Sequence, residues 1–284
     1  LFRSDLKIPE SFTKVLSIYL MLAIGLKGGL EISKTTVNIF EVLGVLSVGV
    51  LLSFALPFLS YFFIRKTTKV DRLNAAAISA HYGSVSAVTF GYAMGYLKNS
   101  GISYEGYLVT LMALMEFPAI LSGLILAKRS KKLEEASKDK LLSGKIIREV
   151  FLNGSIVLLV GGLIIGMSGN EEGMKVIKPY LIDPFYGILG LFLLELGLVA
   201  ARRLKEVENF PFRLAIFGVY MPIISATIAS IISHMLGFEL GTTILLSTLA
   251  ASASYIAVPA AMKIALPEAN PAYYVTLSLC ITFP

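Results

Sequence analysis

Apolar runs of about 20 residues, separated by short clusters of basic residues, recur along the whole chain and restrict what it can fold into. A helical run of this length spans the hydrocarbon core of a bilayer. Charged residues make up only 15% of the chain, against about 25% in soluble domains. The pattern predicts an all-α polytopic membrane protein. Hydropathy and helix-breaking residues place its spans at about 9–30, 37–64, 71–97, 104–128, 145–168, 181–202, 209–236, 241–263 and 271–284.

The basic residues divide unequally between the two ends of these predicted spans. When the connections are assigned alternately to two sides, starting from the N-terminal segment, one side receives 19 Lys and Arg residues. The other side receives Lys34, Lys98, Lys175 and Lys178. Because cytoplasmic connections are enriched in Lys and Arg, the first side is predicted to be cytoplasmic, in a multi-pass protein of the cell (inner) membrane. This bias accounts for the net charge of +6, so no nucleic-acid partner is predicted.

The two halves of the chain share sequence at a nearly constant spacing. Six of twelve residues are identical between 107–118 and 273–284, which are 166 residues apart. Ser84–Ser86 matches Ser252–Ser254 at an offset of 168, and the segment at 22–26 resembles that at 194–198 at an offset of 172. An odd number of helices in each copy orients the copies oppositely in the membrane. Inverted repeats of this kind are typical of secondary transporters, whose sites lie where the copies meet.

We therefore predict a first inverted repeat over residues 1–128, a cytoplasmic linker over 129–144 and a second inverted repeat over 145–284. The second copy opens with a span that has no partner in the first. The helix that contains Glu116 continues for ten residues past Pro118, whereas its partner stops at Pro284. These differences predict an intact fold of five plus five helices, of which the first helix and part of the last fall outside this sequence.

Two segments rich in small and hydroxyl residues occupy equivalent places in the repeats, ISAHYGSVSA at 78–87 and LAASASYIAVP at 249–259. Pro259 cannot donate a helical hydrogen bond and predicts a break near 254–258, and Gly83 permits a matching break in the first copy. A broken helix within the membrane persists only where its backbone is buried in protein or lines a cavity. Small residues also allow close helix packing, which is the alternative interpretation. The equivalent positions favour a binding site.

Two crossed, broken helices would direct N–H groups and positive helix ends at one small volume, which suits an anion. Freed carbonyls and hydroxyls nearby are oxygen ligands suited to Na⁺. The predicted substrate-binding residues are Gly83, Ser84, Ser86, Ala87, Ser252, Ala253, Ser254 and Tyr255. The predicted cation-binding residues are Ser86, Thr89, Glu116, Ser254 and Thr282.

Carboxylates inside a membrane span are costly and are usually functional. Glu116 is predicted to ligate a cation or carry a proton, the alternative being a carboxyl hydrogen-bonded within the helix bundle, and both interpretations stay open for Glu195. His81 is predicted to be packed and hydrogen-bonded, and His234 to be interfacial. With two His and one Cys, no His/Cys metal site is expected. No catalytic motif is present, so the chain is predicted not to be an enzyme and to need no cofactor beyond bound sodium.

The chain resembles the cyanobacterial-type sodium-dependent bicarbonate transporters across its whole length. The resemblance rests on Ile8–Ser11 with the following LAIGLKGG, Gly83–Ser86, Tyr104–Glu105 leading to MEFPAI, and Ala269–Pro271 after Pro259. It implies two inverted five-helix repeats with gate and core domains, assembled as a homotrimer. It also implies uptake of bicarbonate with Na⁺ at the crossing of two broken helices, and a PII-like regulator on the cytoplasmic face.

Some positions differ from the family pattern. The family has a serine triplet followed by aspartate where this chain has Ser252-Ala253-Ser254-Tyr255, and an aspartate at Glu116. It has Ser and Thr where this chain has Val88 and Thr89. Because Tyr255 replaces an anionic side chain, proton coupling stays an alternative to sodium coupling.

Two further functions remain open from the sequence. A cation–proton exchanger would use Glu116, and perturbing that carboxylate would then abolish transport. A non-transporting receptor would instead bind a soluble partner through the basic segment around 128–148.

Overall fold

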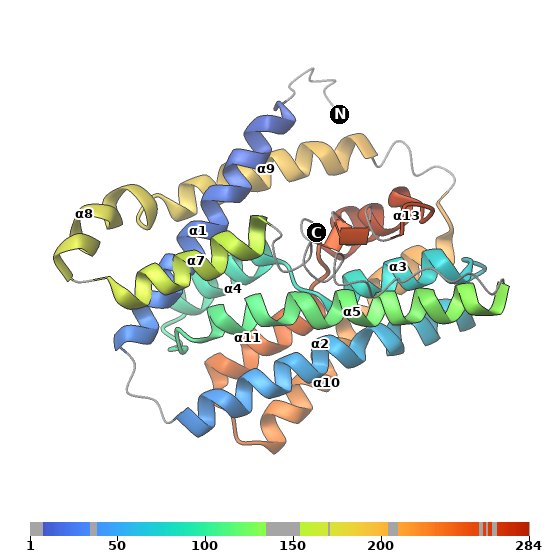
Figure 1. The fold of residues 1–284 in the computed structure, drawn as a ribbon, viewed down its shortest axis with the longest axis horizontal. Helices are drawn as coiled ribbons and strands as arrows, with labels where there is room; N and C mark the ends of the chain where they lie inside the picture. The colour runs from blue at the N-terminus through green and yellow to red at the C-terminus, as the bar shows by residue number, and fades with distance from the viewer. Residues whose placement is uncertain are drawn as a thin grey trace.

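The computed structural model describes residues 8–34, 39–134, 154–169, 171–203, 210–255, 258–259, 261–262 and 266–283. All regular secondary structure in these ranges is helical, as predicted from the sequence (Figure 1). Most of the linker predicted at 129–144 lies outside the described residues, from 135 onward.

The helices follow the predicted apolar runs closely. In the first half they are α1 (Glu10–Lys34), α2 (Ile39–Thr67), α3 (Arg72–Gly83), α4 (Ala87–Asn99) and α5 (Leu108–Glu134). In the second half they are α7 (Gly154–Ser168), α8 (Glu171–Leu181), α9 (Phe185–Arg203), α10 (Phe212–Met235), α11 (Leu240–Ala251), α13 (Pro271–Val275) and the π-helix η2 (Thr276–Thr282). The short helix α8 falls in a stretch treated as a connection from the sequence. Its Glu and Lys residues lower its hydropathy below that of a span, although its apolar residues recur with helical spacing.

The apolar outer faces of the long helices identify a membrane protein. Among the residues that the structure describes, four stretches are long and apolar enough to cross a membrane: Phe40–Thr67, Leu108–Ala127, Glu172–Glu195 and Phe212–Met235. Large apolar side chains such as Phe62 on α2 and Ile223 on α10 are exposed on these stretches. Contiguous exposed apolar surface of this kind is rare on soluble monomers and is suited to lipid.

The ends of the helices gather at two opposite ends of the molecule. The α2–α3 connection and the last turn of α5 lie at one end, whereas α8 and the α4–α5 connection lie at the other (Figure 1). Arg65, Lys66 and Lys69 belong to the first end, and Lys98 belongs to the second. This separation agrees with the alternation of sides that the charge count predicts.

Helices α2, α3 and α5 pack against one another through small and hydroxyl side chains. The Ser53 hydroxyl on α2 donates to the Met115 carbonyl on α5, and the Ser122 hydroxyl on α5 donates to the Phe54 carbonyl at 2.7 Å. Gly123 faces α3 so closely that a Cβ there would lie 2.5 Å from the Ala80 Cβ. These contacts hold α3 in place up to its last residue.

Helix α1 packs along α7 at backbone contact distance. A Cβ on Gly162 would lie 2.8 Å from the Leu22 carbonyl oxygen, and one on Gly29 would lie 2.7 Å from the Met167 nitrogen. Only glycine allows this approach, so the helix pair depends on small residues, as is common between membrane helices.

The start of α3 is joined to the segment before α13. Asp71 caps α3, because its side chain accepts from the backbone N–H groups of Leu73 at 3.0 Å and Asn74 at 2.9 Å. The Asn74 side-chain oxygen accepts from the Asn270 N–H at 2.7 Å. Since α3 and α13 come from opposite halves of the sequence, this contact joins the two halves at the end of α3 opposite the site described next.

Candidate functional site

The helical course stops between α3 and α4 at Ser84, Val85 and Ser86. Ser84 and Ser86 are extended, with ψ angles of 178° and 112°. The Ser86 hydroxyl then caps α4 by accepting from the Thr89 N–H at 3.1 Å. Serine is among the preferred N-cap residues, so the SVSA sequence explains why a new helix begins here.

Gly83 ends α3 against a proline in α2. A Cβ on Gly83 would lie 2.7 Å from the Ser53 carbonyl oxygen and nearer still to the Pro57 ring. Pro57 has no N–H to donate to that carbonyl four residues earlier, so the Ser53 carbonyl lacks its usual helical donor where Gly83 approaches it. The absence of a side chain at Gly83 therefore allows the interrupted segment to pack directly on α2.

The second Ser-rich segment leaves its helix in a similar way. Helix α11 ends at Ala251, and Ser252 is extended with φ −75° and ψ 163°. The Ser252 hydroxyl donates to the Leu249 carbonyl at 2.8 Å, inside the last turn of α11. The helix thus ends a few residues earlier than the break predicted from Pro259, because the serine side chain already satisfies a terminal carbonyl of the helix.

The two segments contact each other directly through buried hydrogen bonds. The Ser86 N–H donates to the Ser252 hydroxyl at 2.9 Å, and the Ser254 N–H donates to the His81 carbonyl at 3.0 Å. The Ser86 hydroxyl donates to the Tyr255 hydroxyl at 3.0 Å. Segments about 170 residues apart in sequence therefore pair by main-chain and side-chain groups, which fixes their relative position. The structure places the predicted substrate-binding residues together at this crossing, at 83–87 and 252–255.

A cavity of about 400 Å³ lies beside the crossing, between α10, α11 and the start of α4. Its wall includes Ser252 and Ala253 of the second segment and Thr89 of α4. It is rich in hydroxyl groups and, among the described residues, is lined by no charged side chain. The hydroxyl-bearing residues are Thr89, Ser230, Thr243, Ser247, Thr248, Ser252 and Thr282.

Sequence reasoning missed the hydroxyl residues that α10 and α11 contribute to this cavity. Thr243 and Ser247 are four residues apart on α11, and Ser247 shares a hydrogen bond of 2.8 Å with Ser230 of α10. Residues spaced by four lie on one helical face, so the Thr243–Ser247–Ala251 series was a detectable signal. It was obscured by the apolar residues that make up the rest of α11.

The predicted cation-binding residues do not share one set of hydrogen bonds. Thr89 and Ser86 are in direct contact, with the Thr89 hydroxyl donating to the Ser86 hydroxyl at 2.9 Å. Glu116 is buried on α5 and accepts from the Ser84 hydroxyl at 2.8 Å. Ser254 uses its hydroxyl to accept from the Val258 N–H at 3.3 Å.

Thr282 lies on another wall of the cavity and joins α10 to α3. Its hydroxyl donates to the Gly218 carbonyl at 2.8 Å and is 2.7 Å from the Tyr82 hydroxyl. Thr282 belongs to the π-helix η2, whose wider turn is uncommon and is often found at functional sites. It is therefore placed to contact a molecule in the cavity, whereas Glu116 reaches the crossing through Ser84.

His81 is packed and hydrogen-bonded, as the sequence predicts. His81 is buried, its Nδ1 is 2.7 Å from the Ala77 carbonyl oxygen, and its ring stacks on Tyr274 at 4.4 Å between centroids. His234 is exposed in the last turn of α10.

Glu195 is buried on α9, and within the described part of the chain its Oε2 makes no hydrogen bond. The described residues include no group of three His, Cys, Asp or Glu side chains that could hold a metal ion.

Comparison with known proteins agrees with these observations. The family model described as the Na⁺-dependent bicarbonate transporter superfamily matches residues 1–284. A search of the curated proteins finds no match. The family match covers the given sequence from end to end and confirms the resemblance noted from its motifs, and the apolar helices are those expected of a membrane transporter. The chain belongs to the Na⁺-dependent bicarbonate transporter superfamily.

Proposed function

We propose that the protein is a secondary active transporter of a small anion, with bicarbonate as substrate and Na⁺ as the coupled cation. The observation that carries this proposal is the hydroxyl-lined cavity of about 400 Å³ that Ser252, Ala253 and Thr89 line, beside the contact between the Ser84–Ser86 and Ser252–Tyr255 segments. An enzymatic function is not proposed, because membership of a transporter family accounts for the architecture without one.

The chemistry of the cavity favours a small oxyanion. Hydroxyl groups can donate hydrogen bonds to oxyanion oxygens and accept one from the bicarbonate O–H. Thr89 lies in the first turn of α4, where the helix presents its positive end. No carboxylate is found among the described lining residues, so an anion there meets no like charge from the wall.

Coupling to Na⁺ follows from the membrane potential. Moving one negative charge into a cell against about 100 mV costs about 2.3 kcal/mol. One accompanying Na⁺ cancels this cost, and a second makes the potential drive uptake. Oxygens of Ser86, Thr89, Ser254 and Thr282 are the proposed neutral ligands, and the Glu116 carboxylate is the proposed anionic one.

Tyr255 defines what is unusual about this site. The family aspartate at this position would supply a negative charge, whereas the Tyr255 hydroxyl here accepts a hydrogen bond from Ser86. We infer that Glu116, on the opposite side of the first segment through Ser84, supplies the charge that Tyr255 does not. The multi-pass topology in the cell (inner) membrane remains a proposal from the hydropathy and charge distribution. The gate and core domains, the homotrimer and the PII-like regulator remain proposals from the resemblance.

The proposal is tested by bicarbonate uptake into proteoliposomes with and without an inward Na⁺ gradient. We expect uptake that depends on the gradient and that falls at least tenfold in Thr89→Val, which keeps the shape of the side chain but removes its hydroxyl. Thr89→Ser should retain most of the activity. Thr227→Val is the matched control, because Thr227 is exposed on α10 and bonds only within its own helix. Absence of uptake under both conditions would remove bicarbonate as the substrate.

Cation–proton exchange is the second candidate, because Glu116 is a buried carboxylate that accepts a hydrogen bond from Ser84 of the first serine segment. An exchanger would move protons in response to a Na⁺ gradient without any bicarbonate. A pH-sensitive dye inside the vesicles distinguishes the two, since the transporter proposal predicts no such signal in bicarbonate-free buffer. Full transport by Glu116→Gln would count against exchange. A receptor function through the basic segment around 128–148 would predict partner binding without any flux.

A further inference from the structure

The lysines predicted to lie away from the cytoplasm gather around one cavity. Only four Lys or Arg residues fall on that side in the charge count, and Lys98, Lys175 and Lys178 among them line a cavity of about 570 Å³. Lys27 of α1 lines it as well. On a side that is otherwise poor in basic residues, this concentration is unexpected for a merely solvated surface.

The cavity is formed by α1, the end of α4, α8 and the start of α9. Helix α8 is held against α1 by a hydrogen bond of 3.0 Å from the Tyr19 hydroxyl to the Leu181 carbonyl. The Lys27 ammonium lies 5.7 Å from the centre of the Tyr186 ring, which lines the same cavity. Elements from different parts of the chain therefore direct lysines to one space.

The positive charge of this cavity is only partly neutralised. Asp183 is the one acidic side chain among its described lining residues, so Lys98, Lys175 and Lys178 together with Asp183 carry a net charge of +2. The Lys178 nitrogen is 4.0 Å from the Asp183 oxygen, and both side chains are more than half exposed. An exposed pair at this distance is weak and screened by salt. The site therefore retains a positive potential that a small anion would reduce.

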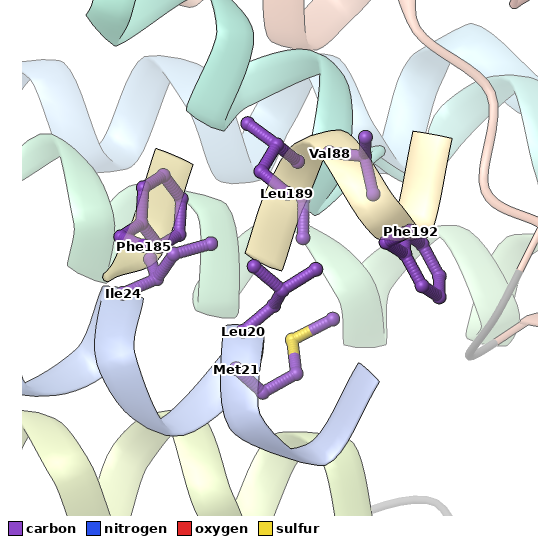
Figure 2. A pocket seen from close by; sticks show the side chains of 8 residues that line it. Leu20, Met21, Ile24, Val88, Phe185, Leu189 and Phe192 are labelled. Atoms are coloured by element: carbon purple, nitrogen blue, oxygen red, sulfur yellow. The ribbon is translucent and has the colours of Figure 1, made fainter. Parts of the chain in front are cut away.

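An apolar cluster separates the lysine-lined cavity from the crossing. Figure 2 shows side chains of α1, α9 and α4 directed at one another, among them Leu20, Val88 and Phe192. The space between them is too small for a water molecule. Phe185 belongs to both this cluster and the lysine-lined cavity, and Val88 follows Ser86 by two residues. The lysines thus lie on the far side of a dry barrier from the serine segments.

We propose that this lysine-lined cavity binds small oxyanions and collects them at the outer side of the protein, ahead of the barrier. A concave surface of one charge with apolar walls concentrates opposite charges and raises their association rate. Lysine suits this task, because its compact ammonium on a flexible stem holds an anion without fixing its orientation. Oxyanion binding stands on the cavity itself, and its role in supplying bicarbonate rests on the proposed function.

Binding is tested by the reactivity of the lysines in purified protein in a neutral detergent. Sodium bicarbonate and sodium phosphate are compared with sodium gluconate at equal ionic strength, and acylation of each lysine by an amine-reactive ester is followed by mass spectrometry. We expect Lys98, Lys175 and Lys178 to react at least threefold more slowly with either small oxyanion, and the exposed Lys69 at the opposite end to be unchanged. Equal reactivity in all salts would overturn the proposal. Protection only by added phosphatidylglycerol would also overturn it, by assigning the cavity to lipid headgroups.

The supply role is tested by uptake kinetics of a Lys175→Gln/Lys178→Gln double variant, with Lys69→Gln as control. At low ionic strength we expect the KM for bicarbonate to rise about tenfold in the double variant with an unchanged maximal rate. The difference should vanish at about 1 M salt, where charges are screened within about 3 Å. An unchanged KM, or a loss of maximal rate alone, would refute the supply role. If neither the unaltered protein nor its variants transport bicarbonate, the proposed function fails. The reactivity experiment still decides in that case whether the cavity binds oxyanions.

Discussion

Replacing Ser252 by alanine tests whether the two serine segments hold each other in place. The Ser252 hydroxyl accepts from the Ser86 N–H at 2.9 Å and donates to the Leu249 carbonyl at 2.8 Å. The Leu249 carbonyl keeps a hydrogen bond in the variant, because the Ser252 N–H also donates to it at 3.2 Å. The buried Ser86 N–H loses its acceptor, which costs about 1–3 kcal/mol. We therefore expect Ser252→Ala to reduce the folding equilibrium constant about 5- to 150-fold.

The measurement is reversible unfolding by SDS in mixed micelles, followed by circular dichroism. Ser252→Thr should restore the stability, because threonine keeps an oxygen acceptor at the same place. Ser168→Ala is the matched control, since Ser168 is exposed and its hydroxyl donates to the Ile164 carbonyl of its own helix at 2.8 Å. A surface change of this kind alters stability by less than about 0.5 kcal/mol.

The reasoning is refuted if Ser252→Ala unfolds at the same SDS fraction as Ser168→Ala. Such a result would mean that the Ser86 N–H finds another acceptor and that the crossing is not held by this bond. A loss of stability in Ser252→Thr equal to that in Ser252→Ala would instead mean that packing volume, not the hydrogen bond, is what the serine contributes.

Three other variants test separate parts of the structure. Gly166→Ala should destabilise the α1–α7 pair by about 1–3 kcal/mol through overpacking, because the added Cβ would lie 3.0 Å from the Leu30 nitrogen. The control is Gly161→Ala on the same helix, whose Cβ would meet nothing within 4 Å. It should leave the stability unchanged in the same SDS titration. Asp71→Ala should lower the stability of the folded protein by about 0.5–2 kcal/mol, because it removes the N-cap of α3. Asp71→Ser should keep most of that stability, because serine can also cap the helix. Glu116→Gln still accepts from the Ser84 hydroxyl, so it should fold normally but lose Na⁺ dependence in the uptake assay, whereas Glu116→Asp should keep it.

The sequence predicts the positions of the helices well because each apolar run must end where polar residues and breakers gather. Helix α2 shows this, with its predicted end near residue 64 and its observed end at Thr67, beside Arg65 and Lys66. Helix α8 was missed because a short amphipathic helix has no excess of apolar residues, so a hydropathy scan reads it as a connection. Its recognition requires the helical spacing of its apolar residues, which a helix of 11 residues reveals only weakly.

The contact between Ser86 and Ser252 could be expected from the predicted inverted repeat, because equivalent segments of such a pair would meet at its centre. The individual bonds could not, since they depend on small displacements of α3 and α11 that no local pattern specifies. The hydrogen bond from the Ser84 hydroxyl to the Glu116 carboxylate is one that no local pattern specifies. So is the bond between Thr282 and Tyr82, which joins residues 200 positions apart through a π-helix that sequence propensities do not predict.

The start of α4 has two different surroundings within three residues. Ala87 and Val88 belong to the dry apolar cluster, whereas Thr89 lines the hydroxyl-rich cavity. A molecule in that cavity therefore has the first turn of α4 and the cluster between itself and the lysines. For an anion to pass from the lysines to the cavity, Leu20 and Phe192 would have to separate from Val88, which requires α1 and α9 to move relative to α4. The close α1–α7 glycine contact favours movement of α1 and α7 as one unit, because bending either helix alone would break backbone contacts along the pair. The two parts that move relative to each other in this proposal are thus the helix group that carries Lys27 and the crossing held by Ser86 and Ser252.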